Sequence, residues 1–193
     1  YLSFLMKPAS SDCNLFCDYC FYRKTADDYP ETSVHRMSEE TLRTIVEKAQ
    51  TPERKAVGYI WQGGEPMLMG LDFYKMAVEI QTEHQKPGQQ ITNTMQTNAI
   101  NIDDEWAAFF RKNNVLVGVS MDGPKDLYDT HRFTRARSSV FEKVTDACDV
   151  LDKHNVDYNI LAVVNNDTVK YPEEIYKYFR GKNFHYLQFI DCV

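Results

Sequence analysis

Apolar residues recur along the chain in two alternating patterns. In 71–84 they fall at helical intervals, as at Leu71, Tyr74 and Val78, which is typical of a helix with one buried face. In 56–61 the run AVGYIW is short, apolar and rich in residues that favour strands. The two patterns predict strands over 2–9, 56–61, 91–98, 115–123, 157–166 and 184–193, and helices over 38–50, 71–84, 103–114, 140–155 and 171–183.

Six predicted strands alternating with helices indicate an α/β fold on a parallel sheet with right-handed crossovers. We expect one domain over residues 1–193, which ends within the sixth strand with no helix behind it. A complete repeat would need that helix, so we expect further chain in the whole protein. In α/β barrels the chemistry lies on loops at the carboxyl ends of the strands. Those loops are therefore where candidate residues should be sought.

Composition narrows the class of protein. The 193 residues are 43% apolar and 26% charged, which suffices for an ordinary globular core. No run of about 18 apolar residues occurs, so no membrane span is expected. The net charge of -6 argues against a nucleic-acid surface, which is normally basic. The N-terminal stretch has no signal-peptide pattern, and five cysteines are an odd number for a disulfide framework, so we expect a reducing cytoplasm.

The stretch CNLFCDYC places Cys13, Cys17 and Cys20 within eight residues. Buried structural thiols are one interpretation, but the polar neighbours Asn14 and Asp18 argue against it. Structural zinc normally takes four protein ligands, and the five histidines show no ligand spacing. An iron–sulfur cluster is held by cysteine thiolates at such short spacings. Three ligands on a four-iron cluster would leave one iron open, as catalytic metal sites do.

Polar residues follow the carboxyl ends of the later strands. QGGEP (62–66) ends the second strand, and its two glycines would let the backbone approach a ligand closely. The other strand ends carry Gln96 and Asn98, Ser120 and Asp122, Asn165 and Asn166, and Asp191, with Arg132 in the loop THRFTR. Simpler interpretations are turns at QGGEP and at Asp122, a half-buried strand at Gln96 and a solvated basic loop at Arg132. For Asn165 and Asn166 we prefer an ordinary loop. Together with the cysteine loop, the polar strand ends indicate a single site.

The two remaining cysteines are expected to be packing residues. Cys148 falls on the apolar stripe of a predicted helix, beside Val144 and Leu151. Cys192 follows the last strand and could approach the site, although we favour packing for it as well.

CxxxCxxC with an aromatic residue before the last cysteine is the signature of radical S-adenosylmethionine (radical SAM) enzymes, and the sequence resembles that superfamily. The stretches KPASSDCNLFCDYCFY, WQGGEP, MQTNAI, GVSMDGP and YLQFIDC resemble the anaerobic sulfatase-maturating enzymes, within the radical SAM enzymes that carry a C-terminal SPASM domain. The resemblance covers residues 2–193. It implies a partial (β/α)6 radical SAM barrel, with the SPASM domain absent from these residues.

The resemblance also implies roles for individual residues. Cys13, Cys17 and Cys20 would hold a [4Fe-4S] cluster, whose open iron binds S-adenosylmethionine (AdoMet). The residues implied to contact AdoMet are Tyr19 and Val193 at the adenine, Gly63, Gly64 and Glu65 at the ammonium group, and Ser120 and Arg132 at the ribose or carboxylate. A substrate channel is implied at Tyr22, Gln62 and Gln96.

The implied activity is oxidation of a Cys or Ser of a sulfatase polypeptide to Cα-formylglycine through a 5′-deoxyadenosyl radical. The implied electron donor is a reduced flavodoxin or a ferredoxin-like protein. In the family, the C-terminal domain holds two auxiliary clusters and an acidic residue proposed as a base, so residues 1–193 alone should cleave AdoMet without efficient substrate oxidation. Two alternatives stay open: another SPASM-type peptide-modifying enzyme, such as a thioether-forming maturase, and a non-catalytic zinc module.

Overall fold

The computed structural model of the chain describes residues 1–23 and 34–192. Its six strands form one sheet in sequence order, and every neighbouring pair is parallel. The strands are β1 (Leu2–Met6), β2 (Ala56–Trp61), β3 (Gln90–Thr97), β4 (Leu116–Ser120), β5 (Tyr158–Val164) and β6 (Leu187–Asp191). The predicted α/β class and parallel sheet are therefore confirmed.

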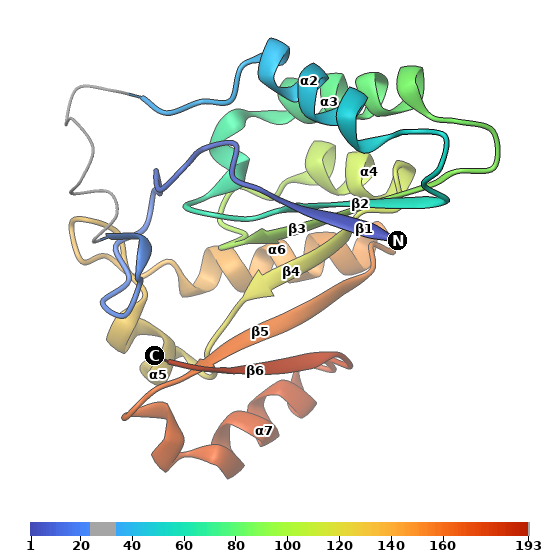
Figure 1. Cartoon of the computed structure of the whole chain (residues 1–193). Helices are drawn as coiled ribbons and strands as arrows, with labels where there is room; N and C mark the ends of the chain where they lie inside the picture. The colour runs from blue at the N-terminus through green and yellow to red at the C-terminus, as the bar shows by residue number, and fades with distance from the viewer. Residues whose placement is uncertain (24–33, 193) are drawn as a thin grey trace.

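Helices cover the outer face of the curved sheet, as Figure 1 shows. The helices of the described residues are α2 (Glu39–Ala49), α3 (Leu71–His84), α4 (Asp104–Lys112), α5 (Lys125–His131), α6 (Phe141–Lys153) and α7 (Pro172–Gly181), with short 3-10 turns at η1 (Pro66–Met69) and η2 (Thr168–Lys170). Of these, α5 lies at the carboxyl ends of the strands (Figure 1). Ser38 caps α2, because its side chain accepts a hydrogen bond from the Thr41 amide.

The core lies between the sheet and these helices. Val57, Tyr59, Val117 and Val119 on the central strands are fully buried, as is Phe110 on α4. Apolar residues on consecutive strands stack at matching heights because the register pairs Val57 with Ile91 and Met95 with Val117. This packing holds the strands side by side, so that their carboxyl ends meet at one edge.

The observed elements differ from the predicted ones at the strand ends. β1 stops at Met6 because the chain turns at once, with the Ser10 amide donating to the Lys7 carbonyl. β4 stops at Ser120, and α5 follows it where the sequence pattern predicted only a loop. That short helix was missed because its seven residues, KDLYDTH, carry few apolar positions to set a period.

Among the helices of the described residues, none is both long and apolar enough to cross a membrane.

Candidate functional site

A cavity of about 300 Å³ opens at the carboxyl ends of the strands. Every described residue implied to hold the cluster, AdoMet or the substrate lines it: Cys13, Cys17, Tyr19, Cys20, Tyr22, Gln62, Gly63, Gly64, Glu65, Gln96, Ser120 and Arg132. These residues come from the carboxyl ends of β1 to β4 and the segments that follow them, and the parallel sheet brings them together. Of the polar strand-end residues, Asn98 and Asp191 also line it, whereas Asp122, Asn165 and Asn166 do not. Val193 lies outside the described residues.

The cysteine loop is anchored by backbone hydrogen bonds to the last residue of α5 and to the segment that follows it. The Phe16 amide donates to the Phe133 carbonyl over 2.7 Å, and the Asp18 amide donates to the His131 carbonyl over 3.0 Å. Between these anchors lies Cys17, whose thiol is half-buried and faces the cavity. The loop is therefore held by residues more than a hundred positions away in the sequence.

All five cysteines are free thiols. Burial raises the pKa of Cys13 to about 12 and also raises the pKa of Cys17. Three free thiols on one cavity wall match the thiolate donors of an iron–sulfur cluster. Among the described residues, no three His, Cys, Asp or Glu side chains are grouped closely enough to hold a single metal ion.

The glycine turn after β2 is pressed against the cysteine loop. Gly64 has φ of +53°, and a Cβ atom there would lie 2.2 Å from the Asp12 carbonyl oxygen. The amide of the next residue, Glu65, donates to that same carbonyl over 2.7 Å. Only glycine allows this approach, because any side chain would collide with the backbone of the loop.

The carboxylate of Glu65 is buried and accepts three hydrogen bonds. The donors are the Met67 amide at 3.0 Å, the Thr97 hydroxyl at 2.8 Å and the Asn98 amide at 2.8 Å. Burial raises the pKa of this carboxyl to about 6, against the lowering effect of the hydrogen bonds. Glu65 therefore ties the ends of β2 and β3 together while it lines the cavity.

Asn98, at the end of β3, extends this tie to the cysteine loop. Its Nδ2 donates to Asn14 Oδ1 over 2.8 Å and lies 3.8 Å from the Cys13 sulfur. The sequence indicated Asn98 only as a polar strand end, without a role. Its contact with the cysteine loop joins residues 84 positions apart, which no sequence pattern displays.

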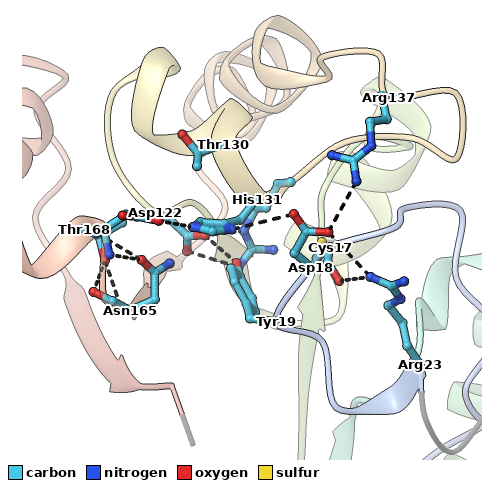
Figure 2. A network of polar contacts seen from close by, with 12 residues as sticks. Cys17, Asp18, Tyr19, Arg23, Asp122, Thr130, His131, Arg137, Asn165 and Thr168 are labelled. Carbon is cyan, nitrogen blue, oxygen red and sulfur yellow. Dashed lines mark hydrogen bonds and ion pairs between the residues drawn. The ribbon is translucent and has the colours of Figure 1, made fainter.

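Asp122 is the centre of a buried polar cluster beside the cysteine loop. Its carboxylate accepts from Arg132 Nε at 2.8 Å and Nη2 at 3.2 Å, from the Val163 amide at 2.9 Å, and from the Tyr19 hydroxyl. Figure 2 shows Tyr19 and Asp122 directed toward each other. Burial alone would lower the pKa of Arg132, but the charge of Asp122 raises it well above its ordinary value. The predicted AdoMet residues Tyr19 and Arg132 are thus positioned by one carboxylate.

The three residues predicted to line a substrate channel lie on the same cavity. Gln96 Nε2 donates to Ser120 Oγ over 2.9 Å, so the side chains of β3 and β4 are joined across the cavity floor. The Tyr22 ring lies 4.3 Å from the Phe21 ring, centroid to centroid, and Lys7 Nζ lies 5.1 Å from the Tyr22 centroid. Their place in a channel stays a prediction.

The two remaining cysteines differ in their surroundings. Cys148 is 2% exposed in the core, as predicted. The packing interpretation of Cys192 is wrong: its side chain is exposed and lines the cavity, because β6 is an edge strand with little over it. Asn165 is a loop residue as predicted, and its Oδ1 accepts from the amides of Asp167 and Thr168 at η2.

The sequence profile of the Radical SAM superfamily matches residues 8–179. The chain belongs to this superfamily. Its sequence is 41% identical over 192 residues to the cysteine-type anaerobic sulfatase-maturating enzyme of Clostridium perfringens, covering 100% of this chain and 52% of that enzyme. It is 39% identical over 190 residues to the serine-type enzyme of Bacteroides thetaiotaomicron, covering 98% of this chain and 46% of that enzyme. The chain thus spans about half the length of the curated relatives it matches.

Solved structures of radical SAM proteins share this fold. Native anSMEcpe with bound AdoMet is similar with a TM-score of 0.92 at 39% identity, covering 100% of this chain and 52% of that chain. The same protein with AdoMet and Cp18Cys peptide gives a TM-score of 0.92 at 40% identity, covering 100% and 51%. The predicted superfamily and partial-barrel fold are therefore confirmed. Radical SAM enzymes use a [4Fe-4S] cluster and AdoMet, which agrees with the predicted cofactor pair.

Proposed function

We propose that this chain carries the radical-generating half of an anaerobic sulfatase-maturating enzyme. Such an enzyme oxidises a Cys or Ser side chain of a sulfatase polypeptide to Cα-formylglycine. One observation carries the proposal: the three loop cysteines and the described residues implied to hold AdoMet line a single cavity. Similarity to both cysteine-type and serine-type enzymes over nearly the whole chain supports it.

The site residues divide into three tasks. Cys13, Cys17 and Cys20 would hold the cluster. The groups that would hold AdoMet are Tyr19, the turn Gly63–Glu65, Ser120 and Arg132. When bound, the two cofactors supply the one-electron chemistry that removes a hydrogen atom from the substrate side chain.

The remaining work belongs to the chain itself. Leu15, Leu161, Val163 and Ile190 give the cavity apolar walls that exclude water from a reactive centre. Tyr22, Gln62 and Gln96 would orient the polypeptide substrate within the cavity. A reduced flavodoxin or ferredoxin-like protein is our proposed electron donor, and the cytoplasm our proposed location, which five free thiols support.

Anaerobic reconstitution with iron and sulfide tests the proposal. We expect a brown protein that absorbs at about 400 nm and that releases 5′-deoxyadenosine from AdoMet when dithionite is the reductant. A colourless protein that binds zinc and does not cleave AdoMet would refute it.

Substrate oxidation needs a second comparison. Residues 1–193 and the same residues joined to the C-terminal half of the Clostridium perfringens relative are each given sulfatase-derived peptides with Cys or Ser at the target position. Mass spectrometry should detect formylglycine efficiently only with the joined protein. A thioether product would instead identify a different peptide-modifying enzyme.

A further inference from the structure

Three exposed or half-exposed arginines gather on the outer side of the cysteine loop, and we call this group the arginine surface: Arg23, Arg135 and Arg137. Two aromatic rings support them. Arg23 Cζ lies 3.6 Å from the centroid of Phe16, and Arg135 Cζ lies 5.7 Å from the same centroid. Arg137 Cζ lies 4.4 Å from the centroid of Phe133. Stacking on rings reduces the conformational freedom of the guanidinium groups and holds them in place.

The arginine surface is joined directly to the cysteine loop. Phe16 lies between Cys13 and Cys17, and its amide donates to the Phe133 carbonyl over 2.7 Å. Arg23 Nη1 donates to the carbonyl oxygen of Cys17 over 3.3 Å. The backbone that carries the cluster ligands is therefore hydrogen-bonded both to Arg23 and to Phe133, the residue whose ring supports Arg137.

The charge of this surface is only partly neutralised. Asp18 faces both Arg23, at 3.6 Å, and Arg137, at 3.9 Å, as Figure 2 shows. Exposed pairs at such distances contribute little, and one carboxylate offsets one cation. Arg137 remains 69% exposed, and Arg135 forms no ion pair with any residue that the structure describes. A positive surface is thus kept at the cysteine loop of a chain whose net charge is -6.

We propose that the arginine surface is the docking site for a small acidic one-electron carrier protein of the flavodoxin or ferredoxin type. This inference rests on the proposed function, which requires an electron to reach the cluster. Complementary charge steers association and fixes orientation, and arginine is enriched in protein interfaces. The carrier loses one electron, the cluster gains it, and no bond forms or breaks in this transfer.

Binding of the carrier is the first measurement. The probes are a purified flavodoxin and, in a parallel arm, a purified [2Fe-2S] ferredoxin, each titrated against reconstituted protein by calorimetry. In the double variant Arg135→Glu, Arg137→Glu we expect affinity for at least one probe to fall by about tenfold or more. Raising ionic strength from about 0.05 M to about 0.3 M should weaken wild-type binding, because salt screens exposed charge.

Matched controls separate docking from folding. The double variant Arg111→Glu, Lys112→Glu places the same charge change on two exposed residues of α4, away from the cysteine loop, and should leave binding unchanged. The milder variant Arg135→Gln, Arg137→Gln should weaken binding without reversing charge. Iron content and reduction of the cluster by dithionite should match wild type in all three variants.

The outcomes distinguish the docking proposal from the proposed function. If neither carrier binds, or if the Arg135 and Arg137 variants bind as wild type does, the docking proposal is overturned. Selective binding of the sulfatase peptide to this surface would overturn it too. Failure of the proposed function would appear separately, as wild-type protein that does not cleave AdoMet even with dithionite.

Discussion

The carboxylate of Asp122 forms a buried ion pair with the guanidinium of Arg132, with Oδ2 2.8 Å from Nε and Oδ1 3.2 Å from Nη2. Asp122 also accepts from the Tyr19 hydroxyl and from the Val163 amide. Four segments of the chain therefore depend on one side chain: the cysteine loop, the end of β4, β5 and the C-terminal end of α5. This dependence makes Asp122 the first residue to test.

Asp122→Asn should destabilise the fold and weaken AdoMet binding. The change leaves the buried charge of Arg132 without its counter-charge, which typically costs about 3–5 kcal/mol. Denaturant unfolding measures the stability, and equilibrium dialysis of AdoMet with reconstituted protein measures the binding. Asp126→Asn, at an exposed position on α5, is the matched control and should change neither quantity.

A double variant distinguishes the loss of one buried charge from the loss of the whole ion pair. Replacing both partners, as in Asp122→Leu with Arg132→Met, removes both buried charges at once. Such a replacement is often close to neutral for stability. We therefore expect the double variant to be more stable than Asp122→Asn while binding AdoMet no better. Equal loss of stability in both proteins would contradict the assigned role of the charge pair.

Gly64→Ala should displace the cysteine loop. A residue other than glycine at positive φ costs about 1–2 kcal/mol, and the collision with the Asp12 carbonyl adds about 1–3 kcal/mol of overpacking. Gly88→Ala is the control, because Gly88 also has positive φ but a Cβ atom there would meet no other atom within 4 Å. Unfolding experiments and iron content should show the larger loss, and the loss of iron, only at Gly64.

The three loop cysteines should be separable from the other two by iron content. Replacement of Cys13, Cys17 or Cys20 by Ala removes a proposed cluster ligand, so each variant should reconstitute with little iron. Cys148→Ala should retain iron and lose about 1 kcal/mol of stability, because its side chain is buried in the core. Cys192→Ser should keep the iron content and the stability of wild type. Iron retention in a loop variant equal to that of wild type would count against the proposed ligand set.

Glu65 should make stability depend on pH in a definite direction. Its pKa in the folded protein is about 6, against an ordinary value of 4.5. Between these values the folded protein holds a proton that the unfolded chain has lost, so the free energy of unfolding should fall as the pH rises through this interval. The fall should be about 2 kcal/mol.

The variant Glu65→Gln isolates this effect because its side chain does not titrate. Between about pH 4 and about pH 7, wild type should lose stability relative to Glu65→Gln as the pH rises. Above about pH 7 the difference in unfolding free energy between the two proteins should stay constant. A difference that stays constant across the range would show that the buried carboxyl has an ordinary pKa. At every pH, Glu65→Gln also places its side-chain NH2 group against one of the three groups that donate hydrogen bonds to the carboxylate. Two donors then face each other, which lowers the free energy of unfolding by about 1–3 kcal/mol.

Much of the fold was predictable because it depends on local pattern. The short apolar run at 56–61 and the helical spacing at 71–84 match β2 and α3 at both ends. The ends of β1 and β4 were predicted too long, because a turn forced by backbone hydrogen bonds, such as that at Ser10, leaves no mark in hydrophobicity. α5 was missed because a helix of seven residues shows too little periodicity.

In the candidate site, too, local features could be predicted from the sequence and long-range contacts could not. The spacing of Cys13, Cys17 and Cys20 favours a cluster over zinc, since thiolate ligands on one short loop need no distant partner to be recognised. Gly64 was identified as a close-approach residue, although what it approaches, the backbone of Asp12, became visible only in the structure.

What the sequence by itself determined is the alternation of strands and helices, and with it the parallel sheet whose carboxyl ends share one edge. In a parallel sheet all strands run in the same direction, so their carboxyl ends lie at one edge. The cysteine loop, the glycine turn and the polar strand ends therefore lie together at that edge. Only the tertiary structure decided which of those groups pair. The choice of Asp122 for Arg132 and Tyr19, and of Asn98 for the cysteine loop, depends on burial and distance between segments far apart in the chain.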